Sequence, residues 1–398
     1  MKKVVLTPQG VRQILSGRLW LTQKEVQGRP GLQPGELATV WSPQGHPLGT
    51  AYFNPKSRIF GRLLSRRLEE ITRDFFAVRF AQALKQRQAF YPGETCLRLI
   101  HGEGDFLPGL TIDLYAGVAV IQITTAGMER FKSEILAALK EVLALKGVVF
   151  KNDLEVRKEE GLPLYVEDYG VREPFWVVID DLKFLIDPFS GQKTGFFLDQ
   201  RENRRYLSRY VKGKVVLDLF CYTGAFALYA AAFGAQRVVA VDRSEKALAW
   251  AAENARQNAL QNQITFIQDD VEHFLSHWTG AEVVILDPPA FIKHRRHQKA
   301  GKRRYLSLNR RALKRLPPGG VLYTSSCSQA LALTELQEIV YQAAVRNGQQ
   351  LRLLSIGIQA LDHPVLISMP ETLYLKGLWL QRLEEATKDF VGINLKKG

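Results

Sequence analysis

Cysteine is scarce in this sequence, and the few cysteines present cannot form a disulfide framework. They are Cys96, Cys221 and Cys327 in a chain of 398 residues, and none belongs to a C-x-x-C pair. This pattern excludes a small protein held together by disulfides and a zinc site built from thiolates. We therefore expect reduced thiols and no bound metal.

Long apolar runs are absent as well. No stretch approaches the roughly 18 consecutive apolar residues of a membrane-spanning helix. The apolar run near the start of the chain ends at Pro8, which is too short for a signal peptide. We therefore expect a cytoplasmic protein that has no membrane among its partners.

Acidic residues are in the minority. The chain has 54 Lys and Arg residues against 40 Asp and Glu, a formal net charge of +14, while 46% of its residues are hydrophobic and 24% are charged. The last two proportions are ordinary for a globular protein, and the length allows two or three cores. The excess of positive charge favours an extended polyanion over a free anionic small molecule as the main partner.

The positive charge is concentrated in two regions. The first 75 residues hold twelve Lys or Arg against five acidic residues, and no acidic residue occurs between Asp287 and Glu335. Eleven cations fall in that gap, namely Lys293, Arg295, Arg296, Lys299, Lys302, Arg303, Arg304, Arg310, Arg311, Lys314 and Arg315. A charge run is usually only a solvated surface, but a gap of this length favours nucleic acid held at two places. Lys293, Arg295 and Arg296 are predicted to contact it.

The pattern of apolar residues predicts three domains. Residues 1–72 contain short β-like runs divided by Pro-Gly pairs, which is typical of a small β-rich module. Residues 73–185 show helical spacing over 74–88 and then strands with one clear helix over 129–145, which predicts an α+β domain. In residues 186–398, apolar strands alternate with amphipathic helices, which predicts parallel βαβ units in a doubly wound α/β sheet.

Three successive strands of the last domain end at an acidic residue. Asp218 closes the first and is followed by a tight loop that holds Phe220 and Gly224, and Asp242 and Asp270 close the next two. Ligands of a doubly wound sheet bind beyond the carboxyl ends of its strands. Glycine also lets a ligand approach the backbone closely. We therefore expect these five residues to line a cofactor site.

The ligand of this site is predicted to be a nucleoside that carries a positive charge. A dinucleotide site needs G-x-G-x-x-G to rest a diphosphate on a helix N-terminus, whereas this loop lacks the second glycine and places an acid where a diphosphate would be repelled. S-adenosylmethionine fits these residues. Its amino group can pair with Asp218, its ribose hydroxyls with Asp242, and its adenine amine with Asp270.

A fourth apolar strand leads into the segment Asp287-Pro-Pro-Ala-Phe291. Prolines fix the backbone and remove N–H donors, so neighbouring carbonyls can face a substrate amine. An Asp-Pro-Pro segment followed by an aromatic residue is typical of amino-group and base methyltransferases, in which Phe291 would stack on a base turned out of its helix. Taken alone, the segment predicts methylation of a nitrogen.

Cys327 lies at the end of a fifth apolar strand, on the same edge of the sheet as Asp287. A thiolate there can add to carbon 6 of a pyrimidine, which makes carbon 5 nucleophilic enough to accept a methyl group. Nearby cations would lower its pKa. A free cysteine is more often a small buried hydrophobe, but this position favours a nucleophile. Cys96 is predicted to be core, and Cys221 to pack against the ligand.

With these residues placed, essentially the whole chain resembles the bacterial 23S ribosomal RNA methyltransferases that modify carbon 5 of cytosine and carry an N-terminal PUA domain. The matching segments are Gly49 to Ile59, His101 to Asp113, Gln192 to Arg201, Asp218 to Gly224, Asp287 to Phe291, Ser325 to Ser328 and Asp362 to Pro364. The resemblance implies an RNA-binding PUA-like β-barrel, a central α+β domain and a C-terminal Rossmann-like class I methyltransferase domain that uses S-adenosylmethionine.

The resemblance also implies roles for single residues. Cys327 would be the nucleophile, and Asp287 the acid that contacts the edge of the base. The implied cofactor ligands are Asp218, Asp242, Asp270, Asp287, Thr194 and Phe196. Another group of RNA cytosine methyltransferases has Pro-Cys in the Asp287 motif, where this chain has Pro289 and Ala290. The base that takes the proton from carbon 5 is therefore not identified, and a water held by Asp287 is only one candidate.

Other functions stay open at this point. An enzyme that methylates a guanine nitrogen would share the fold and cofactor without needing a thiol, and a uridine-specific enzyme could use the same thiolate adduct. A third alternative is a ribosome-assembly factor that binds RNA without catalysis. The sequence also leaves open whether naked 23S RNA or an assembling particle is the substrate, and whether the protein is a monomer or a homodimer.

Overall fold

The computed structural model describes residues 1–28, 30–292 and 297–384. Contacts between residues divide the chain into two compact units, one formed by residues 1–198 with 360–372 and the other by residues 199–359 with 373 onward. Among the described residues, no helix combines the length and the apolar character needed to cross a membrane.

The first unit begins with a five-stranded sheet. Its strands are β1 (Lys2–Val5), β2 (Trp20–Leu21), β3 (Glu36–Trp41), β4 (Pro47–Phe53) and β5 (Gly61–Ser65), in the order β1-β3-β4-β5-β2. The β1–β3 pair is parallel and the others are antiparallel. Helix α1 (Pro8–Leu15) starts with a proline, and the Thr7 side chain accepts a hydrogen bond from Gly10 N, a common way to begin a helix.

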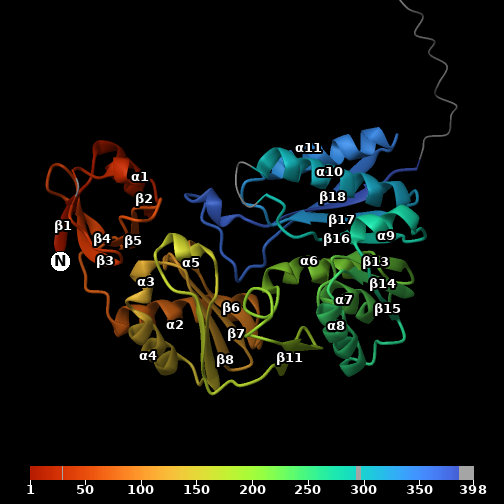
Figure 1. Cartoon of the computed structure of the whole chain (residues 1–398), viewed down its shortest axis with the longest axis horizontal. Coiled ribbons are helices and arrows are strands. Elements are labelled where there is room, and N and C mark those ends of the chain that lie inside the picture. Colours follow the sequence, from red (N-terminus) through yellow and green to blue (C-terminus); the bar gives the residue numbers. More distant parts are fainter. Residues whose placement is uncertain (29, 293–296, 385–398) are drawn as a thin grey trace, which may run out of the picture. The chain divides into compact units, whose positions relative to one another are not determined.

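A second five-stranded sheet follows in the same unit. Its strands are β6 (Cys96–His101), β7 (Leu110–Tyr115), β8 (Val118–Ile123), β9 (Gly147–Asn152) and β10 (Tyr165–Tyr169), and the hairpin β11 (Phe175–Ile179) and β12 (Leu182–Ile186) stands apart. The helices are α2 (Arg73–Phe90), α3 (Ala126–Glu129), α4 (Lys132–Val142) and α5 (Val156–Glu159). Helices α2 and α4 pack against the sheet in one apolar core (Figure 1). The helix predicted over 74–88 is confirmed as α2, and the one predicted over 129–145 is the shorter α4.

The two sheets of the first unit share a buried junction. Tyr52 on β4 donates a hydrogen bond to Pro108 O at 2.8 Å, and a side chain at Gly127 would overlap the Tyr52 ring, since a Cβ there would lie 2.1 Å from it. The buried carboxylate of Glu160 accepts hydrogen bonds from Asn54 at 2.7 Å and Arg62 at 2.9 Å. These contacts explain why the β-rich module and the α+β region group as one unit.

The grouping of residues differs from the predicted domain boundaries in two places. Helix α2 begins at Arg73, where the second predicted domain begins. Residues 186–198 and 360–372, however, which were predicted to lie in the C-terminal domain, group with the first unit. The division into domains at 1–72, 73–185 and 186–398 stays a prediction.

The second unit is built on a seven-stranded sheet. Its strands are β13 (Val215–Leu219), β14 (Arg237–Asp242), β15 (Ile264–Gln268), β16 (Val283–Leu286), β17 (Val321–Ser326), β18 (Leu351–Ile358) and β19 (Lys376–Arg382), in the order β15-β14-β13-β16-β17-β19-β18. The first five are parallel, and β19 runs antiparallel between β17 and β18. This confirms the predicted doubly wound sheet.

Helices cover both faces of that sheet (Figure 1). They are α6 (Arg201–Tyr206), α7 (Ala225–Ala232) and α8 (Glu245–Gln257) on one face, and α9 (Val271–His277), α10 (Gln298–Arg315) and α11 (Leu333–Arg346) on the other. The strand order reverses around β13, whose neighbours are β14 and β16. Such a switch point is where open α/β sheets bind ligands, beyond the carboxyl ends of the strands.

Candidate active site

Three predicted acidic residues lie at the carboxyl edge of the sheet, around the switch point. Asp218 is the fourth residue of β13, Asp242 is the last residue of β14, and Asp287 directly follows β16. The fourth, Asp270, caps helix α9 after β15, and its carboxylate accepts hydrogen bonds from the backbone N–H groups of the first turn of that helix. The sheet therefore brings together the acids that the sequence predicted for a cofactor site.

The loop after β13 has an unusual backbone. Phe220, Tyr222 and Gly224 have φ angles of 63°, 49° and 77°, and left-handed conformations are costly for residues other than glycine. A Cβ at Gly224 would lie 3.1 Å from side-chain atoms of both Leu228 on α7 and Ala251 on α8. The Asp242 carboxylate accepts a hydrogen bond from Tyr222 N at 3.0 Å. The loop is thus held in a strained shape beside two acids, as expected for a ligand-binding loop.

Asp218 is a buried acid, and no positive charge of the described residues is among the groups that set its pKa. It is 1% exposed, and its carboxylate accepts a hydrogen bond from Ala227 N at 3.0 Å. Burial, followed by the repulsion from Asp287, raises the pKa of Asp218 well above its usual value. The two charged groups that act on it, Asp287 and Asp242, are themselves carboxylates. A ligand that brings a cation to this position would relieve the cost, so the predicted pairing of Asp218 with the amino group of S-adenosylmethionine is compatible with this site and stays a prediction.

The predicted nucleophile is the most accessible of the three cysteines. Cys96 lies buried within β6 and Cys221 is buried in the cofactor loop, whereas Cys327, one residue beyond β17, is partly exposed. Burial, and next the neighbouring carboxylates of Asp218 and Asp242, raise the pKa of the Cys221 thiol well above its usual value, which makes it a poor nucleophile. Cys96 is confirmed as a core residue.

Hydroxyl groups lie beside both Asp287 and Cys327. The Ser325 hydroxyl donates to the Asp287 carboxylate. In a separate set, the Ser326 hydroxyl donates to the Tyr305 hydroxyl at 2.8 Å, which also lies 3.1 Å from the hydroxyl of Ser328. Asp287 and Cys327 follow the neighbouring parallel strands β16 and β17.

Lys376 is a residue of this region that the sequence analysis did not single out. It is the first residue of β19, it is 3% exposed, and its Nζ donates to Ser328 O at 2.8 Å. A lone lysine inside the apolar run from Leu373 to Leu380 was the signal that could have found it.

Phe291 lies in the site but its ring already has neighbours. The ring packs against Tyr305 with centroids 4.9 Å apart, and the Arg304 guanidinium lies 4.3 Å from its centroid. It borders a pocket of about 300 Å³ that is also lined by Ala290, His297, Ala300, Gly301 and Arg304. Stacking of a base on Phe291 stays a prediction, and a base on the face covered by the guanidinium would have to displace Arg304.

The cations of helix α10 differ in their partners, and Arg311 and Arg315 donate to backbone carbonyls of residues 272–276. Lys302 and Arg304 form ion pairs with Glu335 at 2.5 Å and Glu272 at 3.1 Å. Lys299, Arg303, Arg310 and Lys314 are instead exposed and have no acidic partner among the residues that the structure describes. At 3.6 residues per turn these four fall within an arc of roughly 60°, so they form a stripe on one face of α10. Lys293, Arg295 and Arg296 lie outside the described residues.

Thr194 and Phe196 belong to the first unit and are buried there. Thr194 donates to the Asp113 carboxylate and shares a hydrogen bond of 2.8 Å with the Tyr115 hydroxyl. The Phe196 ring packs against Phe184 at 4.9 Å. Their predicted role in cofactor binding stays a prediction.

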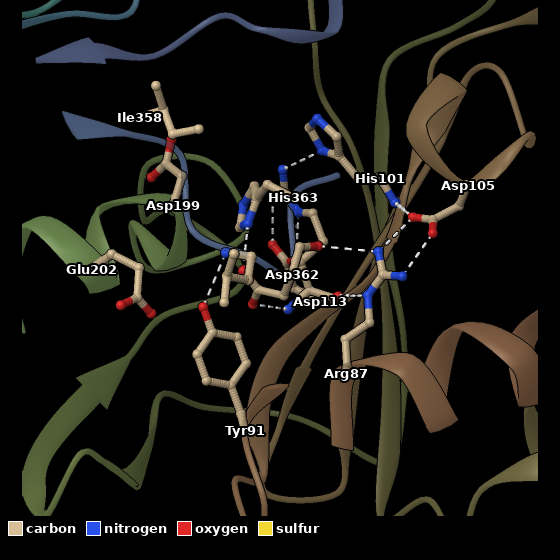
Figure 2. Close-up of polar contacts among 12 residues, drawn as sticks. Arg87, Tyr91, His101, Asp105, Asp113, Asp199, Glu202, Ile358, Asp362 and His363 are labelled. Carbon is tan, nitrogen blue, oxygen red and sulfur yellow. Dashed lines mark hydrogen bonds and ion pairs between the residues drawn. The ribbon is translucent and has the colours of Figure 1, made fainter. Parts of the chain in front are cut away.

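A buried ion-pair network lies in the same unit (Figure 2). Arg87 forms a bidentate pair with Asp105 at 2.7 and 2.6 Å and donates to Asp362 O at 3.1 Å. The Asp362 carboxylate accepts from Arg98 N at 2.8 Å and contacts His363 Nδ1 at 2.7 Å. The network holds the Asp362-His-Pro segment against the second sheet. Over the described residues, no cluster of three or more His, Cys, Asp or Glu has the arrangement of a metal site.

Comparisons with protein families agree with this architecture. Residues 4–66 match the model of the PUA-like domain, and residues 165–353 match that of S-adenosylmethionine-dependent methyltransferases. These matches confirm the predicted PUA-like domain, the predicted class of the C-terminal domain and S-adenosylmethionine as the cofactor.

Individual relatives match nearly the full length of the chain. A protein of Vibrio parahaemolyticus named ribosomal RNA large subunit methyltransferase I is 39% identical over 365 residues, which cover 89% of this chain and 91% of that protein. A protein of Pseudoalteromonas translucida with the same name is 37% identical over 366 residues, which cover 89% and 92%.

A solved structure shows the same fold over almost the whole chain. A protein from Streptococcus mutans, described as a S-adenosylmethionine-dependent methyltransferase, superimposes with a TM-score of 0.82 at 23% identity and covers 96% of this chain and 100% of its own. Another structure, of a methyltransferase in complex with SAH, gives a TM-score of 0.83 with the same identity and coverage.

Proposed function

Because this chain belongs to the ribosomal RNA large subunit methyltransferase I family, we propose that it transfers a methyl group from S-adenosylmethionine to carbon 5 of a cytosine in large-subunit ribosomal RNA. The observation that carries the choice of carbon 5 is the position of Cys327. It is the partly exposed thiol of the chain, and it stands beyond β17, next to the strand that leads into Asp287.

The proposed reaction uses a covalent adduct. The Cys327 thiolate adds to carbon 6, and carbon 5 then takes the methyl group that bound S-adenosylmethionine supplies. Loss of the proton from carbon 5 restores the double bond and expels the thiolate, so the enzyme ends the cycle unchanged. Asp287, whose carboxylate is fixed by the Ser325 hydroxyl, is proposed to contact the edge of the base and to hold a water that accepts this proton.

The experiment that tests this proposal identifies the product. The protein is incubated with methyl-labelled S-adenosylmethionine and unmodified large-subunit ribosomal RNA, either naked or in assembling particles, and the RNA is digested to nucleosides. We expect the label in 5-methylcytidine. Label in 5-methyluridine would assign the enzyme to uridine, and label in a methylguanosine would make Cys327 unnecessary. Binding of the cofactor without any transfer would indicate an assembly factor.

Asp218 is expected to lower the stability of the protein without cofactor and to strengthen binding of the cofactor. Its raised pKa means that the folded protein retains a proton that the unfolded chain has released, so its contribution to stability falls as pH rises above about 4. Asp218→Asn removes that loss. We expect the variant without cofactor to be more stable than wild type near pH 7, with a smaller gain near pH 4, and to bind S-adenosylmethionine about 30-fold more weakly because a charged hydrogen bond is lost.

Thermal unfolding at several pH values and calorimetric titration of the cofactor measure both effects. The matched control is Asp269→Asn on the same edge, because the hydrogen bond from His273 lowers the pKa of Asp269. Its stability should change in the opposite direction. Equal cofactor affinity in wild type and Asp218→Asn would mean that Asp218 does not bind the cofactor.

RNA is proposed to lie along the stripe of α10 and on the PUA-like domain. Each phosphate contact adds about 0.7 to 0.9 to the slope of log affinity against log salt. The double variant Lys299→Gln/Arg303→Gln should therefore reduce the slope by about 1.5 and weaken RNA binding about tenfold at low salt. Filter binding of a ribosomal RNA fragment over a salt series measures both the slope and the affinity.

A matched double variant controls for net charge. Lys212 and Arg237 are exposed and lie at the opposite, amino-end edge of the same sheet, before β13 and at the start of β14. Lys212→Gln/Arg237→Gln removes the same charge and should leave the slope unchanged. If both double variants lowered affinity equally, the stripe would have no special role.

A further inference from the structure

The side chain of Lys376 spans the position of Cys327. Lys376 pairs with Ser326 in the antiparallel register of β19 and β17, which places its backbone beside the residue before Cys327. Its Nζ then binds the carbonyl of Ser328, the residue after Cys327, at 2.8 Å. The buried ammonium group is therefore bound to the backbone one residue beyond the proposed nucleophile.

Lys376 has no acidic partner at salt-bridge distance among the described residues. Glu335, a carboxylate that acts on it electrostatically, forms its ion pair with Lys302. An ammonium that is 3% exposed and bound only to a carbonyl is costly for the fold. Burial accordingly lowers the pKa of Lys376 to about 8 and the charge of Cys327 opposes this shift, so the group is still mostly protonated at neutral pH.

We propose that Lys376 is the counter-ion of the Cys327 thiolate, a positioning residue that keeps the nucleophile ionised and directs it toward the edge of the sheet. This inference rests on the proposed function only in taking Cys327 as the nucleophile. The thiol proton leaves to solvent, and the negative charge that remains on sulfur is balanced by the ammonium until sulfur bonds to carbon 6. When the adduct collapses, the same ammonium stabilises the departing thiolate.

Two other titratable groups of this region set the background for this effect. Tyr305 on α10 interacts with it electrostatically, and burial raises the pKa of Tyr305, so this group stays neutral near pH 7. Asp287, reached through Ser325, would oppose ionisation of the thiol. Of the described groups named here, Lys376 is the one that favours the thiolate.

The test measures how fast iodoacetamide alkylates Cys327 as a function of pH in the full-length protein, with the peptide containing Cys327 followed by mass spectrometry. Lys376→Gln keeps a donor for Ser328 O but removes the charge. We expect the midpoint of the Cys327 profile to rise by about one pH unit in Lys376→Gln and in Lys376→Met, and to return to within half a unit of wild type in Lys376→Arg.

Failure of the Lys376 proposal can be distinguished from failure of the proposed function, because the alkylation of Cys327 needs no RNA. An unchanged midpoint in Lys376→Gln, or equal shifts in the Gln and Arg variants, would overturn the proposal and leave Lys376 a structural tie between strands. A shifted midpoint together with a product other than a 5-methylpyrimidine would overturn the proposed function instead. As a second readout, the acidic limb of kcat/KM against pH should move with the alkylation midpoint.

Discussion

Replacing Cys327 with alanine is expected to lower methyl transfer to ribosomal RNA by at least about 1,000-fold. An unactivated carbon 5 is too weak a nucleophile to accept a methyl group, and the adduct at carbon 6 is what activates it, so no remaining group can substitute for the thiolate. The affinity for S-adenosylmethionine should stay within about twofold, because Cys327 is not among the predicted cofactor ligands, which include Asp218 on β13 and Asp242 on β14. Single-turnover transfer measures the first effect and calorimetry the second.

Cys221→Ala is the control for this prediction. Cys221 is also a cysteine at the carboxyl edge of the sheet, but it is buried and its thiol has a raised pKa, so its loss should reduce transfer only modestly. If Cys327→Ala retained normal rates, the chemistry would require another acceptor, and Asp287 with Phe291 would become the catalytic centre of an enzyme that methylates nitrogen.

Replacing Arg87 with methionine is expected to destabilise the first unit by about 3 to 5 kcal/mol. Arg87 is 1% exposed and binds Asp105 through two hydrogen bonds, and its Nε donates to Arg98 O at 3.0 Å. The variant leaves the buried Asp105 carboxylate without its cation, although it still accepts from His101 N. Urea unfolding followed by circular dichroism, with limited proteolysis to identify the unit that unfolds, measures the loss.

Arg73 provides a matched comparison on the same helix. It is the first residue of α2 and pairs with Asp74 at 2.8 Å and Glu141 at 3.2 Å, with all three side chains largely exposed. Arg73→Met should therefore cost far less stability than Arg87→Met, because exposed ion pairs are screened by solvent. Similar losses for the two variants would mean that the buried network of Figure 2 does not stabilise the first unit.

The methyltransferase sheet could be predicted from sequence because its central strands are covered on both faces. β13 and β16 are nearly continuous apolar runs, as expected for buried parallel strands. Parallel strands also bring their carboxyl ends to one edge. The order of Asp218, Asp242 and Asp287 along the chain was therefore enough to place them together.

The parts of the fold and of the site that could not be predicted depend on pairings between residues far apart in the sequence. β19 is the last strand in the chain but inserts between β17 and β18, and only this insertion puts Lys376 opposite Ser326. Residues 360–372 likewise group with the first unit, because Asp362 accepts hydrogen bonds from the Arg87 side chain and from Arg98 N. No local periodicity carries these pairings. The apolar run around Lys376 can mark this lysine as unusual, but its position beside the proposed nucleophile could be found only in the structure.

The central claim is that Cys327 forms a covalent bond to carbon 6 of a cytosine, and trapping tests it most directly. Ribosomal RNA that contains 5-fluorocytidine is incubated with the protein and S-adenosylmethionine, because fluorine at carbon 5 cannot leave as a proton does and the adduct cannot collapse. We expect a complex that survives denaturation, with the modified nucleotide attached to the peptide containing Cys327 and absent in Cys327→Ala. Formation of 5-methylcytidine in ordinary RNA without any such complex, or attachment at another residue, would contradict it.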